Sequence, residues 1–102
     1  MKIVWTETAE LTYKAELDFI LKKWNVKERN KFILLIDEVT QRLVEFPTIG
    51  RYSDTGDIYL VISKQTTLIY RLLDDDILEL LLFWNNKQNP DDLEQIINSL
   101  RK

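Results

Sequence analysis

The chain has 102 residues, of which 45% are apolar and 30% are charged, with only two glycines and two prolines. This composition excludes a disordered, collagen-like or low-complexity protein and predicts a single domain over residues 1–102. Cysteine and histidine are both absent, which excludes disulfide frameworks, thiolate zinc sites and every Ser-His-Asp or Cys-His catalytic arrangement. We therefore expect no metal and no cofactor, and any catalysis would have to use carboxylates, Lys, Arg or Tyr.

The charge balance and the apolar runs indicate which partners and which cellular location to expect. The 14 Lys and Arg residues face 17 Asp and Glu residues, for a net charge of −3. An acidic chain is repelled by phosphate backbones unless its cations cluster, so direct binding of free nucleic acid is not expected. The longest apolar run, over residues 80–84, is far too short to span a bilayer, and residues 1–7 lack the apolar core of a signal peptide. We therefore expect a cytoplasmic protein that does not associate with membranes.

Two amphipathic helices are predicted in the first half of the chain. A short β-branched strand over residues 2–5 precedes Thr6, whose side chain is suited to cap a helix over residues 7–24. Asn25 is expected to cap a second helix, which must end before Pro47. Apolar side chains recur three or four residues apart, as Tyr13, Leu17, Ile20 and Trp24 in the first helix and as Phe32, Ile36, Val39, Leu43 and Phe46 in the second. Because only one or two residues separate the helices, they must fold back on each other as an antiparallel hairpin.

From residue 58 the apolar residues alternate with a period of two, which predicts three strands. The expected strands cover residues 58–63, 67–72 and 77–84, and an exposed turn of three aspartates joins the last two. The third strand is apolar on both faces except at Glu79, so we place it in the middle of the sheet or beneath the helices. Pro90 then begins a C-terminal helix, whose apolar stripe is formed by Leu93, Ile96, Ile97 and Leu100.

The resulting order, β-α-α-β-β-β-α, predicts the α+β class. We expect the N-terminal helical hairpin to pack on a mainly antiparallel four-stranded sheet, followed by the C-terminal helix. The first strand has no neighbour in sequence with which to pair, so it should join the sheet at an edge.

Four sequence strings carry a resemblance to a known family. Trp5-Thr6 begins the first helix, and residues 43–51 (LVEFPTIGR) close the helical hairpin. Residues 68–71 (LIYR) and 82–90 (LFWNNKQNP) follow in the strand half. Together these strings resemble the RelE/ParE superfamily of toxins from bacterial toxin-antitoxin pairs, over nearly the whole chain. The resemblance implies a compact toxin that is held inactive by an antitoxin, whose flexible C-terminal segment wraps around it.

Members of this superfamily differ in their activity. RelE-like members resemble ribosome-dependent endonucleases that cut mRNA in the decoding site, whereas ParE-like members resemble gyrase poisons without nuclease chemistry. The closing Lys-Gln-Asn-Pro string is nearer the ParE pattern, in which Arg often stands at the position of Lys87. We therefore expect a ParE-like toxin that acts by binding a cellular target, such as DNA gyrase or the ribosome. The alternatives are a RelE-like mRNA endonuclease and a non-toxic homologue that only forms the antitoxin complex.

Charge in the strand half also favours binding over cleavage. Metal-free RNA cleavage needs Lys, Arg, Tyr or Glu side chains that converge on one face of the sheet. Between residues 47 and 90 the acidic residues outnumber the basic ones, which are Arg51, Lys64, Arg71 and Lys87. These four cations are our candidates for contact with the target or the antitoxin. If all four gathered in one exposed hollow, away from carboxylates, the binding interpretation would be wrong.

The candidate residues also have structural interpretations. In the nuclease alternative, Arg51, Lys64 and Arg71 would hold phosphate, and Tyr70 or Glu79 would transfer the proton. We expect instead that Arg71 pairs with Glu79 across the strand hairpin and that Tyr70 packs as a strand aromatic. For Arg51, a bond to loop carbonyls or to a neighbouring aspartate is as well supported as a contact with a partner.

Overall fold

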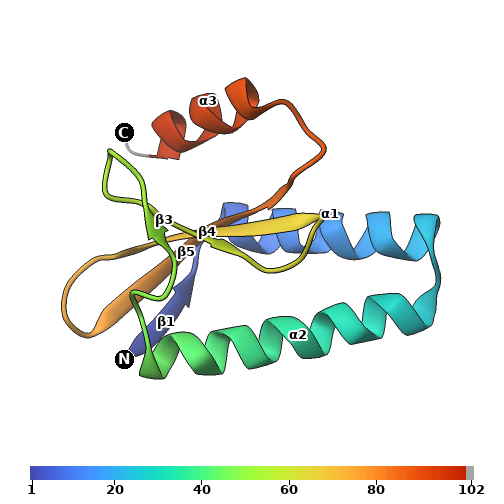
Figure 1. The fold of residues 1–102 in the computed structure, drawn as a ribbon, viewed down its shortest axis with the longest axis horizontal. Helices are drawn as coiled ribbons and strands as arrows, with labels where there is room; N and C mark the ends of the chain where they lie inside the picture. The colour runs from blue at the N-terminus through green and yellow to red at the C-terminus, as the bar shows by residue number, and fades with distance from the viewer. Residues whose placement is uncertain (101–102) are drawn as a thin grey trace.

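The computed structural model describes residues 1–100, which form three helices and a five-stranded mixed sheet (Figure 1). In chain order the elements are β1 (Lys2–Trp5), α1 (Glu7–Lys23), α2 (Val26–Glu45), β2 (Arg51–Tyr52), β3 (Ile58–Val61), β4 (Thr66–Leu72), β5 (Ile77–Asn85) and α3 (Pro90–Leu100). The predicted α+β class and the predicted order are confirmed. The sheet has one strand more than the four expected, because β2 was not predicted.

The sheet has the strand order β1-β5-β4-β3-β2. β1 runs parallel to β5, and all other neighbours pair antiparallel. β1 therefore lies at one edge and β5 in the interior, both as predicted. β2 lies at the opposite edge and consists of two exposed residues. Two residues are too few to show a strand alternation, which is why the sequence predicts no strand here.

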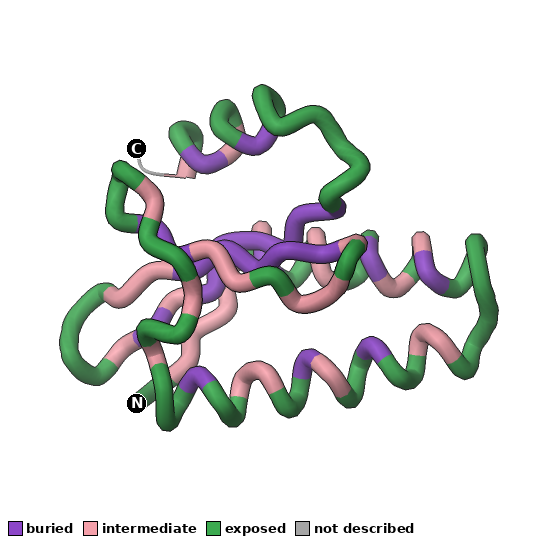
Figure 2. Tube along the Cα trace, in the orientation of Figure 1, coloured by how far each residue is buried: buried purple, intermediate pink, exposed green. Residues whose placement is uncertain are grey.

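Helices cover both faces of the sheet, and Figure 1 shows the α1–α2 hairpin on one side and α3 on the other. The core beneath the hairpin includes Leu68, Tyr70, Leu80 and Phe83, together with apolar side chains of both helices. α3 packs on the opposite face, in a cluster formed by Ile69, Leu81, Leu82, Trp84, Leu93 and Ile97. β4 and β5 are therefore buried from both sides, as the purple central strands in Figure 2 show.

A bulge in β5 distributes its leucines between the two faces. Ile69 of β4 lies opposite Leu82, but the next residue, Tyr70, lies opposite Leu80. Leu81 is therefore the extra residue of the bulge, and the alternation of side chains is shifted by one. As a result, Leu81 and Leu82 both contribute to the cluster beneath α3.

Two threonines fasten α1 to β5 next to this bulge. The Thr6 side chain accepts from the backbone N–H of Ala9, as the predicted N-cap, and donates to the carbonyl of Leu80 at 2.9 Å. The Thr12 Oγ1 accepts from the backbone N–H of Phe83 at 2.9 Å and donates back within α1. β1 ends opposite Leu80, so these side chains give partners to β5 backbone groups where the neighbouring strand has ended.

The ends of the helical hairpin differ from the predicted apolar stripes. Asn25 caps α2 as expected, by accepting from a backbone N–H of its first turn. Trp24 and Phe46, however, are the C-caps of α1 and α2, and they are 59% and 56% exposed. A C-cap residue leaves the helical path, so its side chain no longer follows the stripe toward the sheet. The strand predicted over residues 58–63 is also shorter than expected and ends at Val61.

One tyrosine fastens the loop between α2 and β2 to the sheet. The buried Tyr70 hydroxyl donates to the carbonyl of Pro47 at 2.9 Å and accepts from the backbone N–H of Gly50 at 3.3 Å. A Cβ at Gly50 would lie 2.6 Å from the Ile58 side chain and 2.7 Å from the carbonyl oxygen of Tyr59. The close approach therefore requires glycine, and the loop that leads into β2 is held firmly against the sheet.

We predict that Thr12→Val lowers the free energy of unfolding by about 1–3 kcal/mol, because the Phe83 N–H loses its acceptor while valine keeps the side-chain shape. Thr12→Ser retains the hydroxyl and is the matched control, which should cost clearly less. Urea unfolding of the three proteins measures the difference. Equal losses in the two variants would contradict this hydrogen bond.

Tyr70→Phe should lower the free energy of unfolding by about 1–3 kcal/mol at neutral pH, because two backbone groups of the loop lose their partner. Burial raises the pKa of the Tyr70 phenol above its ordinary value of 10.0. The stability that this group contributes is therefore complete below its ordinary pKa and is lost as the pH rises through the raised one.

Urea unfolding at increasing pH should thus show a smaller alkaline loss of stability for Tyr70→Phe than for the unmodified chain. Tyr52→Phe removes an exposed hydroxyl and is the control at neutral pH, where it should match the unmodified chain; at alkaline pH it removes only the smaller contribution, charge repulsion from Tyr52, to the raised pKa of Tyr70. An unchanged alkaline profile in Tyr70→Phe would show that the buried phenol has no such role.

Candidate functional site

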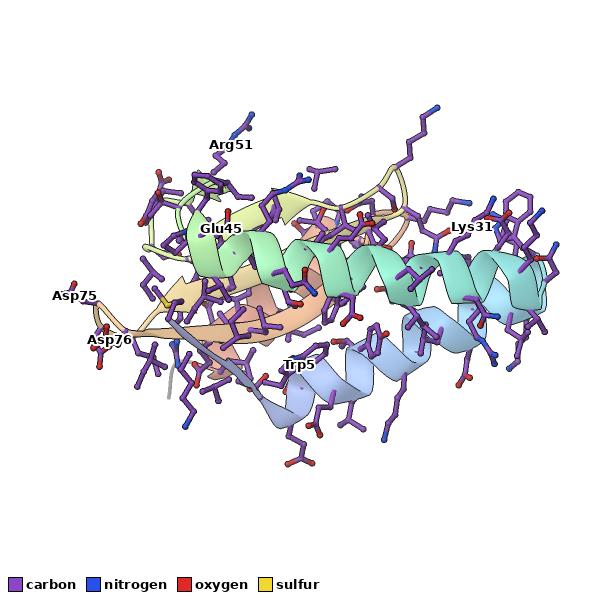
Figure 3. All side chains as sticks on the ribbon, turned by 90° about the horizontal axis from the view of Figure 1, so that it is seen from below. Trp5, Lys31, Glu45, Arg51, Asp75 and Asp76 are labelled. Atoms are coloured by element: carbon purple, nitrogen blue, oxygen red, sulfur yellow. The ribbon has the colours of Figure 1, made fainter. Side chains whose placement is uncertain are left out.

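The first candidate cation, Arg51, lies in the edge strand β2. Its side chain extends away from the body of the protein (Figure 3). It borders a hollow of about 500 Å³ whose walls include Ile49, Tyr52 and Val61, all three of them exposed. Arg51 is therefore a solvent-exposed cation beside an apolar hollow at the edge of the sheet.

Arg71 is engaged by the neighbouring strand, as the sequence predicts. It lies on β4 opposite Glu79 of β5, and its Nε and Nη2 atoms each lie 2.8 Å from Glu79 Oε1. The two side chains are 31% and 17% exposed, so water screens the pair only in part. The predicted pairing is confirmed. It compensates the positive charge at the centre of the sheet.

Lys64 and Lys87 lie in adjacent loops at one end of the sheet. The Asn86 side chain joins these loops, donating to the Lys64 carbonyl at 3.2 Å and accepting from the Thr67 hydroxyl at 2.8 Å. Lys87 borders a second hollow, of about 420 Å³, whose largely apolar walls come from α1, β5 and α3. Arg51 and Lys87 therefore line different hollows, and the four candidate cations do not gather in one.

The proton-transfer residues of the nuclease alternative are occupied by structural contacts. Tyr70 lies in the core beneath the helical hairpin, and its hydroxyl is bonded to the loop backbone. Burial raises the pKa of this phenol, so the ionised form that could accept a proton is scarcer near neutral pH. Glu79 is held by Arg71. Because Tyr70 and Arg71 are consecutive in one strand, their side chains point to opposite faces of the sheet and do not converge.

Two residues near Lys87 were not among the sequence-based candidates. Glu16 is buried, and its Oε2 accepts from the Thr66 hydroxyl at 2.6 Å and from Gln65 Nε2 at 3.3 Å. Its place within the first apolar stripe was the available signal, since a carboxylate on a buried helix face needs hydrogen-bond partners. Lys23 lies beside Lys87, whose side chain lowers the pKa of Lys23 by hydrogen bonding first and by charge repulsion second. No sequence signal connects these two lysines, because distant segments bring them together.

The described residues offer neither a metal site nor a membrane-spanning helix. Within residues 1–100, no group of three or more Asp, Glu, His or Cys side chains could hold a metal ion. Over the same residues, every helix is too short or too polar to cross a bilayer. The two hollows each combine apolar walls with a cation. Such a surface is suited to a protein segment that carries apolar and acidic side chains.

Among solved structures, the fold is similar to two toxin structures. One is described as the chromosomal ParDE TA system from P. aeruginosa, with 20% identity and a TM-score of 0.70, covering 83% of this chain and 95% of that one. The other is described as a YoeB/ParE toxin from Agrobacterium tumefaciens, with 17% identity and a TM-score of 0.58, covering 84% of this chain and 99% of that one. At these identities the likeness concerns the fold alone.

At the level of sequence, no curated protein matches the chain. Residues 3–90, however, match the family described as the ParE toxin of the type II toxin-antitoxin system, parDE. This match covers both helices of the hairpin and every strand except the first residue of β1, and it confirms the resemblance drawn from the four sequence strings. The chain therefore belongs to the ParE toxin family of type II toxin-antitoxin systems.

Proposed function

We propose that this ParE-family chain acts in the cytoplasm by binding a cellular protein, with DNA gyrase as the candidate target, and that a cognate antitoxin neutralises it. The observation that carries the proposal is the Arg71–Glu79 pair. An RNA-cleaving site in the middle of the sheet would need this cation for the phosphate, and here it is bonded to a carboxylate.

The Arg71–Glu79 pair argues against RNA cleavage because it occupies a cation that the reaction would need. Without a metal, the reaction needs positive charge on the phosphate and side chains that remove one proton and supply another. Freeing Arg71 for a phosphate would leave Glu79, which is only 17% exposed, as an uncompensated charge. Arg51 and Lys87 border separate hollows and cannot substitute for it at the centre of the sheet.

The two hollows support a protein partner. Each has largely apolar walls and a cation, Arg51 at one hollow and Lys87 at the other, and the buried Glu16 also lines the second. Burial of apolar surface supplies about 25 cal/mol per Å², and a charge at the margin fixes the register of the bound segment. We propose that the flexible segment of the antitoxin contacts one or both hollows through apolar and acidic side chains.

Induction of the chain in a bacterial host without antitoxin should arrest growth and activate the DNA-damage response, because a gyrase poison leaves broken DNA. Purified chain should increase the amount of cleaved DNA when it is added to gyrase and supercoiled plasmid. The same protein should leave translated mRNA intact in a ribosome-containing extract.

Two outcomes would overturn this proposal. Cuts at defined codons of translated mRNA would establish the endonuclease alternative. Normal growth at full protein expression would establish a homologue that only forms the complex.

Arg51→Glu should weaken antitoxin binding by at least about tenfold, because an acidic segment would then meet a like charge at the hollow. Arg42→Glu makes the same charge change at an exposed position of α2, away from both hollows, and should have little effect. Isothermal titration with the cognate antitoxin gives both affinities. Equal losses in the two variants would show that net charge alone, and not the hollow at Arg51, governs binding.

A further inference from the structure

One end of the protein gathers positive charge although the whole chain is acidic. We define the basic tip as residues 22–31, where α1 passes into α2, together with the turn 63–65 and the loop 85–88. These segments contain seven of the 14 Lys and Arg residues of the chain and one carboxylate, Glu28. Glu28 is paired with Lys31 at 3.4 Å, so its charge is compensated within the tip.

The three segments of the basic tip are in contact with one another. The Lys87 side chain lies close enough to Lys23 to lower the pKa of the Lys23 ammonium. The Asn86 side chain donates to the carbonyl of Lys64 at 3.2 Å. A hollow of about 220 Å³ is lined by residues of α1, α2 and the turn 63–65. The lysines at positions 23, 64 and 87 are all exposed, so three cations from three neighbouring segments are open to solvent at the tip.

Most of the acidic residues lie elsewhere, although the buried carboxylate of Glu16 accepts from Gln65 of the tip and lines the hollow beside Lys87. The turn of three aspartates between β4 and β5 is exposed, and Figure 3 shows Asp75 and Asp76 at the opposite end of the molecule from Lys31. The protein is therefore electrically polarised, and its net charge of −3 conceals a positive end. A local cluster of cations attracts polyanions even when the whole molecule is acidic.

An exposed aromatic ring lies among these lysines. Trp24 is 59% exposed, whereas Trp84 is buried. The Lys23 Nζ atom lies 5.6 Å from the centre of the Trp24 ring and 5.5 Å from that of Phe19. An exposed indole with a cation beside it is a combination that single-strand-binding proteins use, because the ring stacks on a base while the cations hold the phosphates.

We propose that the basic tip binds single-stranded nucleic acid, with phosphates on Lys23, Lys64 and Lys87 and a base stacked on Trp24. A single strand fits better than a duplex, because paired bases do not offer their faces to a side chain. It also fits better than an acidic protein segment, whose carboxylates would use the lysines but leave the indole without a flat partner. This binding involves no cleavage and is independent of the function proposed above.

Fluorescence anisotropy with a fluorescein-labelled single-stranded DNA of about 12 nucleotides tests this proposal. Three phosphate contacts predict that log K falls with log salt concentration with a slope of about −2 between about 50 and 200 mM salt. The same oligonucleotide annealed to its complement should bind at least about tenfold more weakly, because stacking on Trp24 is lost.

Variants of the tip should separate the two contributions. Lys23→Gln/Lys87→Gln should weaken binding by at least about tenfold and reduce the slope to about −0.7, because one phosphate contact is left. Trp24→Ala should weaken binding by about 5- to 100-fold with an unchanged slope, because stacking releases no counterions. The matched control, Lys2→Gln/Arg42→Gln, removes the same charge outside the tip and should bind almost as the unmodified chain does.

Three results would overturn the proposal. The first is an equal loss of affinity in the control and tip variants, with circular dichroism showing that all are folded. The second is binding of the duplex as tight as that of the single strand. The third is displacement of the labelled strand by polyglutamate as effectively as by unlabelled strand at equal negative charge, which would assign the tip to acidic proteins.

Discussion

The burial of β5 from every side is the constraint on which the rest of the structure depends. Its residues from Leu80 to Asn85 are all buried, with β4 along one side, β1 beside the strand up to Leu80, and helices on both faces. Such a strand is stable only in the interior of a sheet. β1 must therefore reach it from before the helical hairpin and pair in parallel, and both α1 and α3 must pack on it.

The hairpin and the sheet could be predicted from the sequence because periodicity reports burial directly. The caps at Thr6 and Asn25 and the central position of β5 follow from local patterns, and the structure confirms them. Periodicity does not predict the structure where a strand is only two residues long or where the backbone leaves the helical conformation. β2 has two residues, and Trp24 and Phe46 are C-caps whose side chains point away from the core. The bulge at Leu81 depends on packing against α3 and has no local signal.

In the candidate site, too, contacts between residues close in sequence could be predicted, whereas contacts between distant segments could not. Arg71 and Glu79 belong to one strand hairpin, so their pairing is predictable from spacing and is observed. Lys23 and Lys87 meet only because the end of α1 lies beside the loop after β5. The net charge is a sum over the whole chain, so it does not show which charged side chains lie close together in the fold. The structure therefore changes the interpretation of the charges, from a uniformly acidic protein to one with a positive end.

The positive charge in the sheet and the positive charge at the basic tip have different consequences for function. At the centre of the sheet, positive charge is compensated by Glu79, which favours binding of a protein target over cleavage of RNA. At the tip, the lysines of three neighbouring segments are exposed, and we propose this part of the surface as the one suited to a polyanion. A polyanion held at the tip would lie away from Arg71, so binding there does not imply cleavage at the sheet.

We propose that Arg71 stabilises the sheet and does not contact a reacting phosphate, and one measurement tests this assignment most directly. The double variant Arg71→Gln/Glu79→Gln removes both charges together and leaves two amides that can bond to each other across the strands. We expect growth arrest on induction, in a host without antitoxin, to be as strong for this variant as for the unmodified chain at equal protein level. Loss of arrest in a folded, equally abundant double variant would contradict the assignment. It would instead support a direct role of Arg71 in cleaving RNA.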